Sequence, residues 1–322
     1  MFSLVRSLEY LEQVNTVLGI ILNGLLLYAV MRFSGTYLGA YKQLLTCFAS
    51  ADMFLVIMHV LMRPRTILVG YTHAVVTDTV FDDRRITALF VAFQSIPFTL
   101  IGVHFLYRYW SVRRPHLIAL FSNKKFVAFL ISLTSGSMTS WFLMSVYGTG
   151  GEEESAARKS VVEACQHKYG RRIEHAWIVL DHWRDDRFDA ALFLTIVLTD
   201  VLMFSSLSLA TIFAIRTFYH IKNTAKMSAQ FIQLQKKLLL ALCAQTFVPS
   251  VFVYIPCVVT INIPLFRIHV DIFHDISMPL FTCFPVLDAS VMILLITDYR
   301  KGLMGIIWKK KVNNEATSRF TT

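Results

Sequence analysis

The chain has 322 residues, of which 55% are hydrophobic and 16% are charged, and its formal net charge is +10 at pH 7. A soluble chain of this length would suggest two domains. Charge is instead concentrated in short segments between long apolar runs, which excludes that organisation. The positive charge therefore indicates a basic face toward an anionic membrane leaflet and does not suggest a nucleic-acid partner.

Seven apolar segments fill the chain almost from end to end. About 20 mostly apolar residues cross a bilayer as one helix and satisfy their backbone polar groups internally. The pattern predicts an all-α membrane protein, a seven-transmembrane helix bundle over residues 1–308, with a short amphipathic helix at about 299–308 and a basic, disordered tail over 309–322. The predicted spans are Val14 to Met31, Gln43 to Met62, Ala88 to Tyr107, Phe126 to Tyr147, Ala190 to Ile215, Leu238 to Ile263 and Ile272 to Thr297.

The distribution of basic residues predicts which way the bundle sits. An odd number of spans places the two termini on opposite sides of the membrane. With the N-terminus outside, 18 of the 31 Lys and Arg residues fall on the inner side. The positive-inside rule therefore favours an outer N-terminus and an inner C-terminus.

Three polar residues at similar depth in the first, second and seventh spans are candidates for a polar switch cluster. They are Asn23, Asp52 and Asp288. An ionisable group in the middle of a span costs roughly 2.5–3.5 kcal/mol, so it needs a partner, a water or a cation. The cluster is equally compatible with a structural link between helices and with a signalling switch. Prolines inside the spans predict kinks at Pro97, Pro249, Pro256, Pro279 and Pro285.

Motifs for catalysis and for cofactors are lacking. The sequence has no nucleotide-binding loop or nucleophile elbow, and no pair of histidines at helical spacing for a metal. We therefore expect no enzyme activity, no cofactor and no metal site. His167, His175 and His182 in the long outer loop leave zinc binding as a minor alternative. Cys165 is the one cysteine in an outer loop, so no disulfide between outer loops is expected.

Three motifs together resemble a known family. HFLYRYW (His104 to Trp110) lies at the inner end of the third span, and LQKKLLLALCAQTFVPSVFVYIPC (Leu234 to Cys257) runs through the sixth. FPVLDASVMILLITDYR (Phe284 to Arg300) ends the seventh. The chain resembles the nematode serpentine chemoreceptors of the Str superfamily, which are G-protein-coupled receptors, and the resemblance extends to about Trp308.

The sequence also departs from receptors of the rhodopsin type. They carry an acidic residue before the third-span arginine, where this chain has Tyr107, and a proline after the seventh-span aspartate, where it has Ala289. Their outer disulfide needs a cysteine near the third span, and the segment from Arg63 to Tyr107 contains none.

The resemblance implies a chemosensory receptor that binds a small external molecule, such as an odorant or pheromone, and activates a heterotrimeric G protein. It implies a multi-pass protein of the plasma membrane, and points to the sensory cilium of chemosensory neurons. The alternative is a multi-span transporter or channel for a small solute, which a continuous polar path through the spans would favour.

Two groups of candidate site residues follow. A ligand pocket is expected in the outer halves of the third, sixth and seventh spans, with Gln94 and Tyr254 orienting the ligand; simple packing is the alternative for its aromatic members. At the inner end we expect a G-protein-coupling site around Arg108, for which anchoring at the bilayer edge is the alternative. The pocket residues are Phe90, Phe93, Gln94, Tyr254, His274, Met278 and Phe281, and the coupling residues are Tyr107, Arg108, Tyr109, Lys236 and Lys237.

Overall fold

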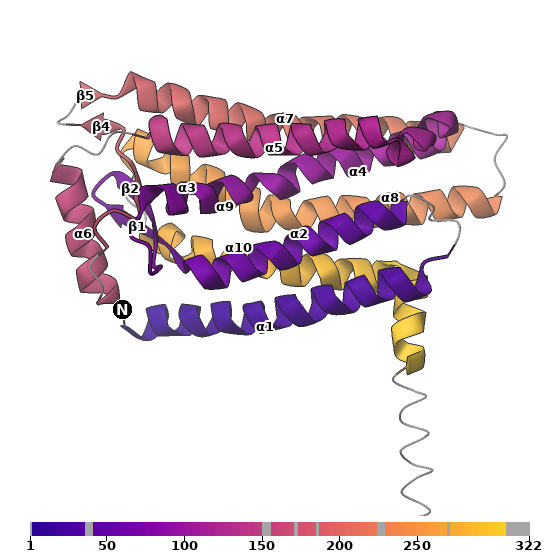
Figure 1. Ribbon diagram of the computed structural model, residues 1–322, viewed down its shortest axis with the longest axis horizontal. Coiled ribbons are helices and arrows are strands. Elements are labelled where there is room, and N and C mark those ends of the chain that lie inside the picture. Colours follow the sequence, from indigo (N-terminus) through magenta and orange to yellow (C-terminus); the bar gives the residue numbers. More distant parts are fainter. Residues whose placement is uncertain are drawn as a thin grey trace, which may run out of the picture.

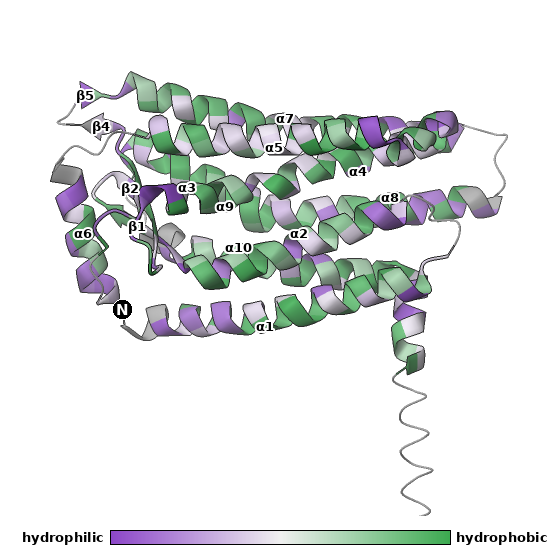
Figure 2. Cartoon of the chain, viewed as in Figure 1, coloured by the Kyte–Doolittle hydropathy of each residue, from purple (hydrophilic) through white to green (hydrophobic). Residues whose placement is uncertain are grey.

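A computed structural model describes residues 2–35, 41–149, 156–170, 173–184, 187–223, 229–268 and 271–306. Seven helical segments in this part of the chain are long and apolar enough to cross a membrane, with mean hydropathy between 1.5 and 2.0. They lie side by side as one bundle (Figure 1), and apolar residues predominate along their length (Figure 2). The predicted seven-helix fold is confirmed.

Most of the spans are single helices, whereas the third and sixth are interrupted. In chain order the bundle helices are α1 (Phe2–Phe33), α2 (Tyr41–Met62), α3 (Arg84–Phe93), α4 (Ser95–Arg113), α5 (Lys124–Tyr147), α7 (Ala190–Asn223), α8 (Ala229–Pro249), α9 (Ile255–Asn262) and α10 (Asp271–Leu295). The π-helix η3 (Ser250–Tyr254) joins α8 to α9, and the short 3-10 helix η4 (Ile263–Phe266) follows α9.

Prolines account for the two interruptions. Pro97 has no N–H to offer the carbonyl one turn earlier, and the third span breaks there, at Gln94 between α3 and α4. The π-helix lies between Pro249 and Pro256, each of which removes a helical hydrogen bond. The third and sixth spans therefore contain irregular turns where the proline pattern predicts kinks, whereas α10 stays helical through its two prolines.

One end of the bundle, called the sheet end below, is covered by an antiparallel sheet. The hairpin strands β1 (Pro64–Val69) and β2 (Thr72–Thr77) pair with β3 (Trp177–Leu180) from the long loop. Gly70, with φ of 59°, supplies the left-handed conformation that the tight hairpin turn requires. Helix α6 (Ala156–Tyr169) packs on the outer face of the sheet (Figure 1), and the short pair β4 (Trp183–Arg184) and β5 (Arg187–Phe188) lies beside it.

The opposite end, called the tail end, holds the 3-10 helix η2 (Pro115–Ser122) and a helix over residues 297–306 that turns sharply away from α10 (Figure 1). Gly302 lets this helix cross α1 closely, because a Cβ there would lie 2.5 Å from the Phe33 ring. The Tyr299 hydroxyl is 3.0 Å from Ser34 Oγ. The predicted amphipathic helix begins within this segment, while residues 307–322, including the predicted tail, lie outside the described residues.

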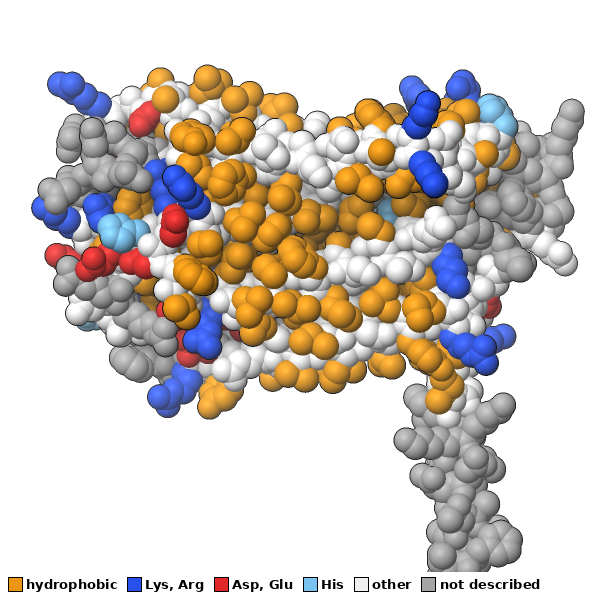
Figure 3. Space-filling model, in the orientation of Figure 1, with side chains coloured by type: hydrophobic (Ala, Val, Ile, Leu, Met, Phe, Trp, Pro, Cys, Tyr) orange, Lys and Arg blue, Asp and Glu red, His pale blue; other side chains and the backbone are white. Residues whose placement is uncertain are grey.

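The charge pattern leads to a prediction of sidedness. Acidic side chains gather at the sheet end in Figure 3, whereas Lys and Arg side chains lie at both ends of an apolar surface, and 18 of the 31 belong to the segments predicted to be inner. Because basic residues favour the inner side, we expect the tail end to be cytoplasmic. An epitope tag fused after Thr322 should bind antibody only in permeabilised cells, and a tag before Met1 should bind it on intact cells. The reverse pattern would invert the assignment.

Candidate functional site

A small chamber lies inside the bundle directly beneath the sheet. Its volume is about 70 Å³, and its wall is mainly apolar, with a few hydroxyl, amide and imidazole groups. Gln94 reaches this chamber because the third span breaks at that residue. The residues that line it are Thr66, His73, Val75, Phe90, Val91, Gln94, Phe98, Trp141, Val253, Cys257, Thr260, Ile261, Ser277, Met278 and Phe281.

The hairpin covers the chamber. Successive residues of its strands face opposite sides of the sheet, so every second side chain points toward the chamber. His73 and Val75 of β2 line the chamber, while Ala74 and Val76 pack in the cluster beneath α6. Thr66 of β1 lies 3.0 Å from Ser277 of α10, hydroxyl to hydroxyl. The sheet thus presents two polar side chains and one valine to the chamber, and apolar side chains to α6.

A second chamber of about 70 Å³ adjoins the first on the side of α5 and α7. His73, Val75 and Trp141 line both, so the two are separated only by side chains. Thr195 and Thr199 of α7 add hydroxyl groups to its wall. The combined space suits a small, largely apolar molecule that carries a hydrogen-bonding group.

The structure brings together four of the predicted pocket residues. These four line the chamber: Phe90, Gln94, Met278 and Phe281. Phe93 instead packs edge-on against Phe54, with ring centroids 4.9 Å apart. Tyr254 does not line the chamber and lies behind Phe98, with the two ring centroids 4.2 Å apart. Its hydroxyl lies 2.8 Å from Ser206 Oγ. The side chain of His274 is outside the described residues.

The predicted polar cluster lies deeper in the bundle. Asn23, Asp52 and Asp288 are all fully buried. The Asp52 carboxyl faces that of Asp288, and apart from this contact neither Asp52 oxygen has a hydrogen-bond partner among the described residues. Gln245 of α8 donates a hydrogen bond of 2.9 Å to Asp288. Two unscreened carboxylates at this depth repel one another, which favours a shared proton or a cation between them.

Asn23 joins this region through the backbone. Its side-chain amide donates hydrogen bonds of 3.0 Å to the carbonyls of Gly19 and Pro285. Pro285 lies in α10, three residues before Asp288. Asn23 therefore fixes the α10 backbone near Asp288, and among the described residues its side-chain amide donates to backbone carbonyls and to neither carboxylate.

At the tail end, Arg108 is covered by an aromatic ring. Only 3% of its surface is exposed, and its guanidinium lies 3.6 Å from the centre of the Tyr41 ring. Tyr41 also stacks on Tyr107, with centroids 5.4 Å apart. Two guanidinium nitrogens have no hydrogen-bond partner in the described part of the chain. The cation is thus held by a cation–π contact, in a region where receptors of the rhodopsin type carry an acidic residue.

The remaining predicted coupling residues differ in exposure. Tyr109 is buried and stacks on Phe213 of α7, with ring centroids 5.4 Å apart. Lys236 and Lys237 are exposed on α8 at the tail end. Only the lysines of this group are therefore accessible to a partner in the present conformation.

Three contributors to the site were not predicted from the sequence: the β1–β2 hairpin, Tyr41 and Gln245. The hairpin has a local signal in the sequence, because the segment 64–77 is rich in β-branched residues on both sides of Gly70. Tyr41 and Gln245 act through contacts 67 and 43 positions away, to Arg108 and Asp288, which no local pattern encodes.

The chemistry of the described side chains adds no reactive centre. Those residues contain no group of three or more His, Cys, Asp or Glu side chains placed to hold a metal. Cys165 of α6 is 1% exposed, and burial raises the pKa of its thiol to about 12. This thiol is therefore protonated at neutral pH and poorly reactive.

Seven helices long and apolar enough to cross a membrane, packed around a small internal chamber with buried polar residues below it, define a seven-helix membrane protein. A family model described as serpentine type 7TM GPCR chemoreceptor Str matches residues 8–304. The chain belongs to this family.

Relatives of the chain come from nematodes. It is 24% identical to serpentine receptor class r-10 of Caenorhabditis elegans over 307 residues, which cover 92% of this chain and 90% of that protein. The protein of the same name from Caenorhabditis briggsae is also 24% identical, over 314 residues with the same coverage. G-protein coupled receptor str-217 of C. elegans is 29% identical over 140 residues, or 40% of each chain.

Proposed function

We propose that this protein is a chemosensory receptor that binds a small external molecule in the chamber beneath the sheet and activates a heterotrimeric G protein at the tail end. The observation that carries the proposal is the chamber itself, since it is a mainly apolar cavity between helices with a few polar groups. Family membership supports it. By the sidedness argued above, the chamber lies near the outer surface of the plasma membrane, and the sensory cilium is the proposed location.

The route from ligand to G protein runs through the interrupted spans. A ligand at Gln94 and Phe98 touches the break in the third span, and Phe98 packs on Tyr254 at the end of the π-helix. Below this point Gln245 of the sixth span bonds to Asp288 of the seventh. We infer that a shift of the sixth span about Pro249 changes this bond and uncovers Arg108, because packed helices convert small shifts into discrete rearrangements.

Calcium imaging tests the function directly. Cells that express the full chain with a promiscuous G protein are screened against volatile and water-soluble compounds. A concentration-dependent response that vector-transfected cells lack is the expected result. A surface-expressed protein that responds to no compound in a broad panel, and shows no ligand-independent coupling, would argue against the receptor function.

The chamber assignment makes a sharper prediction. Gln94→Ala removes a hydrogen-bonding amide from the chamber wall, and one such bond contributes about 1 kcal/mol. We expect an agonist found in the screen to lose about fivefold in potency, measured as the half-maximal concentration in calcium imaging. Phe93→Ala is the matched control, because Phe93 is the adjacent residue and does not line the chamber. Equal potency in both variants would contradict the assignment.

A further inference from the structure

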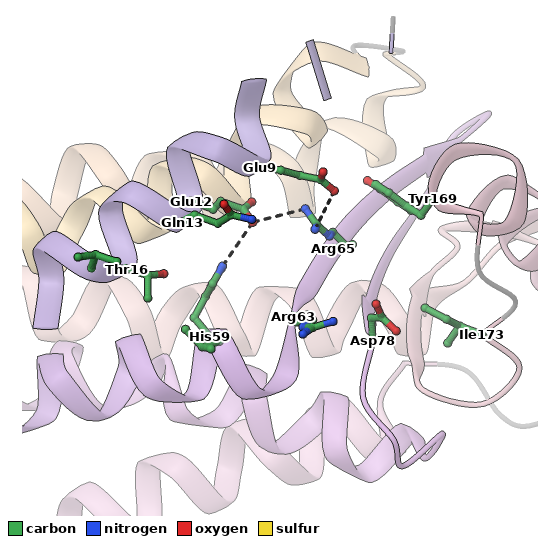
Figure 4. Close-up of a pocket in the computed structure, with 12 residues that line it drawn as sticks. Glu9, Glu12, Gln13, Thr16, His59, Arg63, Arg65, Asp78, Tyr169 and Ile173 are labelled. Atoms are coloured by element: carbon green, nitrogen blue, oxygen red, sulfur yellow. Dashed lines mark hydrogen bonds and ion pairs between the residues drawn. The ribbon is translucent and has the colours of Figure 1, made fainter. Parts of the chain in front are cut away.

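A third and larger hollow opens on the side of the bundle near the sheet end. It has a volume of about 560 Å³ and lies among α1, α2, β1 and the end of α6 (Figure 4). We call it the vestibule. Its lining residues are Glu9, Glu12, Gln13, Thr16, Val17, His59, Val60, Arg63, Arg65, Asp78, Tyr169 and Ile173.

The inner wall of the vestibule is held by ion pairs between three elements. Arg65 of β1 reaches Glu9 at 3.1 Å and Glu12 at 3.4 Å, both on α1 (Figure 4). His59 of α2 approaches the same Glu12 carboxylate at 3.9 Å. Glu12 therefore joins the hairpin and the second span to the first.

A narrow void lies between the vestibule and the chamber. It holds about 20 Å³, little more than one water molecule. Thr16 and His59 line both this void and the vestibule, and Gln94 and Phe281 line both the void and the chamber. The three hollows thus form one series that crosses the bundle from its side.

The constriction is built from contacts that can separate without unfolding. Asn15 of α1 donates a hydrogen bond of 3.0 Å to Thr282 of α10 across it. On the other side the His59 ring stands between Glu12 and Phe90, with a ring centroid 6.3 Å from that of Phe90. A rotation of His59 away from Glu12 would widen the passage at the cost of one side-chain contact of 3.9 Å.

Entry from above is more strongly closed. Three carboxylate contacts from Asp82 hold the backbone amides of residues 174–176 at the start of β3, at 2.5–2.9 Å. Trp183 donates a hydrogen bond of 3.0 Å to the Leu265 carbonyl, and Lys168 pairs with Asp275. Lifting the sheet end away from the bundle would break several of these bonds together with the Thr66–Ser277 hydroxyl contact.

We propose that small uncharged molecules enter the chamber sideways, through a portal between α1, α2 and α10 whose gate is formed by Asn15, Thr16 and His59. The vestibule collects the molecule, and the apolar chamber wall favours uncharged species once it has passed the gate. This proposal rests on the proposed function only in that the natural ligand is taken to use the portal. Access of a small reagent to the chamber can be measured without knowing that ligand.

Cys257 provides a native reporter, since it lines the chamber. The full chain in lipid nanodiscs is treated with methyl methanethiosulfonate, a small uncharged reagent. The thiolate displaces methanesulfinate and becomes the methyl disulfide, which mass spectrometry of the Cys257 peptide quantifies over time. Comparing rates between variants cancels the intrinsic reactivity of this buried thiol.

The variants differ at the gate. Thr16→Trp fills the narrow void and should slow modification of Cys257 about tenfold, whereas His59→Ala widens the void and should accelerate it by a similar factor. Leu18→Trp is the matched control, because Leu18 is two residues further along α1, lines none of the three hollows and is 41% exposed. It should leave the rate unchanged.

Two outcomes would overturn the portal. One is an unchanged Cys257 rate in a folded Thr16→Trp variant, with folding checked by thermal melting. The other, decisive if Thr16→Trp does not fold, is an unchanged rate in His59→Ala. Neither readout involves agonist or G protein, so the portal can fail while the receptor function stands, and the receptor function can fail while the portal stands.

Discussion

Replacing Arg108 by alanine is expected to abolish G-protein activation while surface expression stays normal. Arg108 is the buried cation at the tail end, and its guanidinium has nitrogens without hydrogen-bond partners in the described structure. A cation held by an aromatic ring is released more readily than one in a buried ion pair, which suits a group that must meet a partner helix. Agonist-stimulated nucleotide exchange, normalised to surface protein, is the measurement.

Two further variants separate coupling from anchoring at the bilayer edge. Arg113→Ala removes an exposed arginine one turn away, which binds the Tyr109 hydroxyl at 2.7 Å, and should reduce exchange only slightly. Tyr41→Leu removes the ring over Arg108, and loss of a cation–π contact of about 0.5–2 kcal/mol should raise ligand-independent exchange roughly 2- to 30-fold. Full signalling by Arg108→Ala at normal surface levels would exclude the coupling role.

Asp52→Asn is expected to change signalling strongly and stability little. The substitution keeps the shape of the side chain and removes one of two facing carboxyl groups, so it relieves repulsion in the resting bundle. If proton or cation occupancy between Asp52 and Asp288 differs between resting and active states, agonist potency should shift by about tenfold or more. Concentration–response curves and the melting temperature of the purified protein are the two measurements.

Asp200→Asn provides the matched control for this cluster. Asp200 is also a carboxylate within a span, and it accepts a hydrogen bond of 3.0 Å from Asn262 near the sheet end. It is half-buried and does not contact Asp52 or Asp288 through any described bond. Equal effects of the two substitutions on potency would show that the carboxylate pair has no special role in switching.

The spans could be predicted from sequence because their signal is local. A run of apolar residues is enough to specify a helix in lipid, whatever its neighbours are. The irregular turns at Gln94 and after Pro249 also follow from local chemistry, since proline removes a donor wherever it occurs. The chamber is different, because which side of a helix faces inward depends on how the helices rotate against one another.

Particular residues illustrate this limit. Tyr254 and Gln94 both have polar groups near the same depth, but only Gln94 lines the chamber, while Tyr254 bonds to Ser206 of α7. Tyr41 begins the second span and reads as an interfacial tyrosine, whereas in three dimensions it covers Arg108 at the end of α4. Such assignments require the packing of helices that are distant in sequence.

The way the sheet end is closed has a consequence for the redox behaviour of the protein. The pairing of β2 with β3 joins the segment before the third span to the long loop, and all five cysteines are free. This closure consists of hydrogen bonds, ion pairs and apolar packing, and no covalent cross-link contributes to it. The sheet end can therefore fold without an oxidising compartment or a disulfide isomerase. Thiol reductants leave every bond that holds it intact.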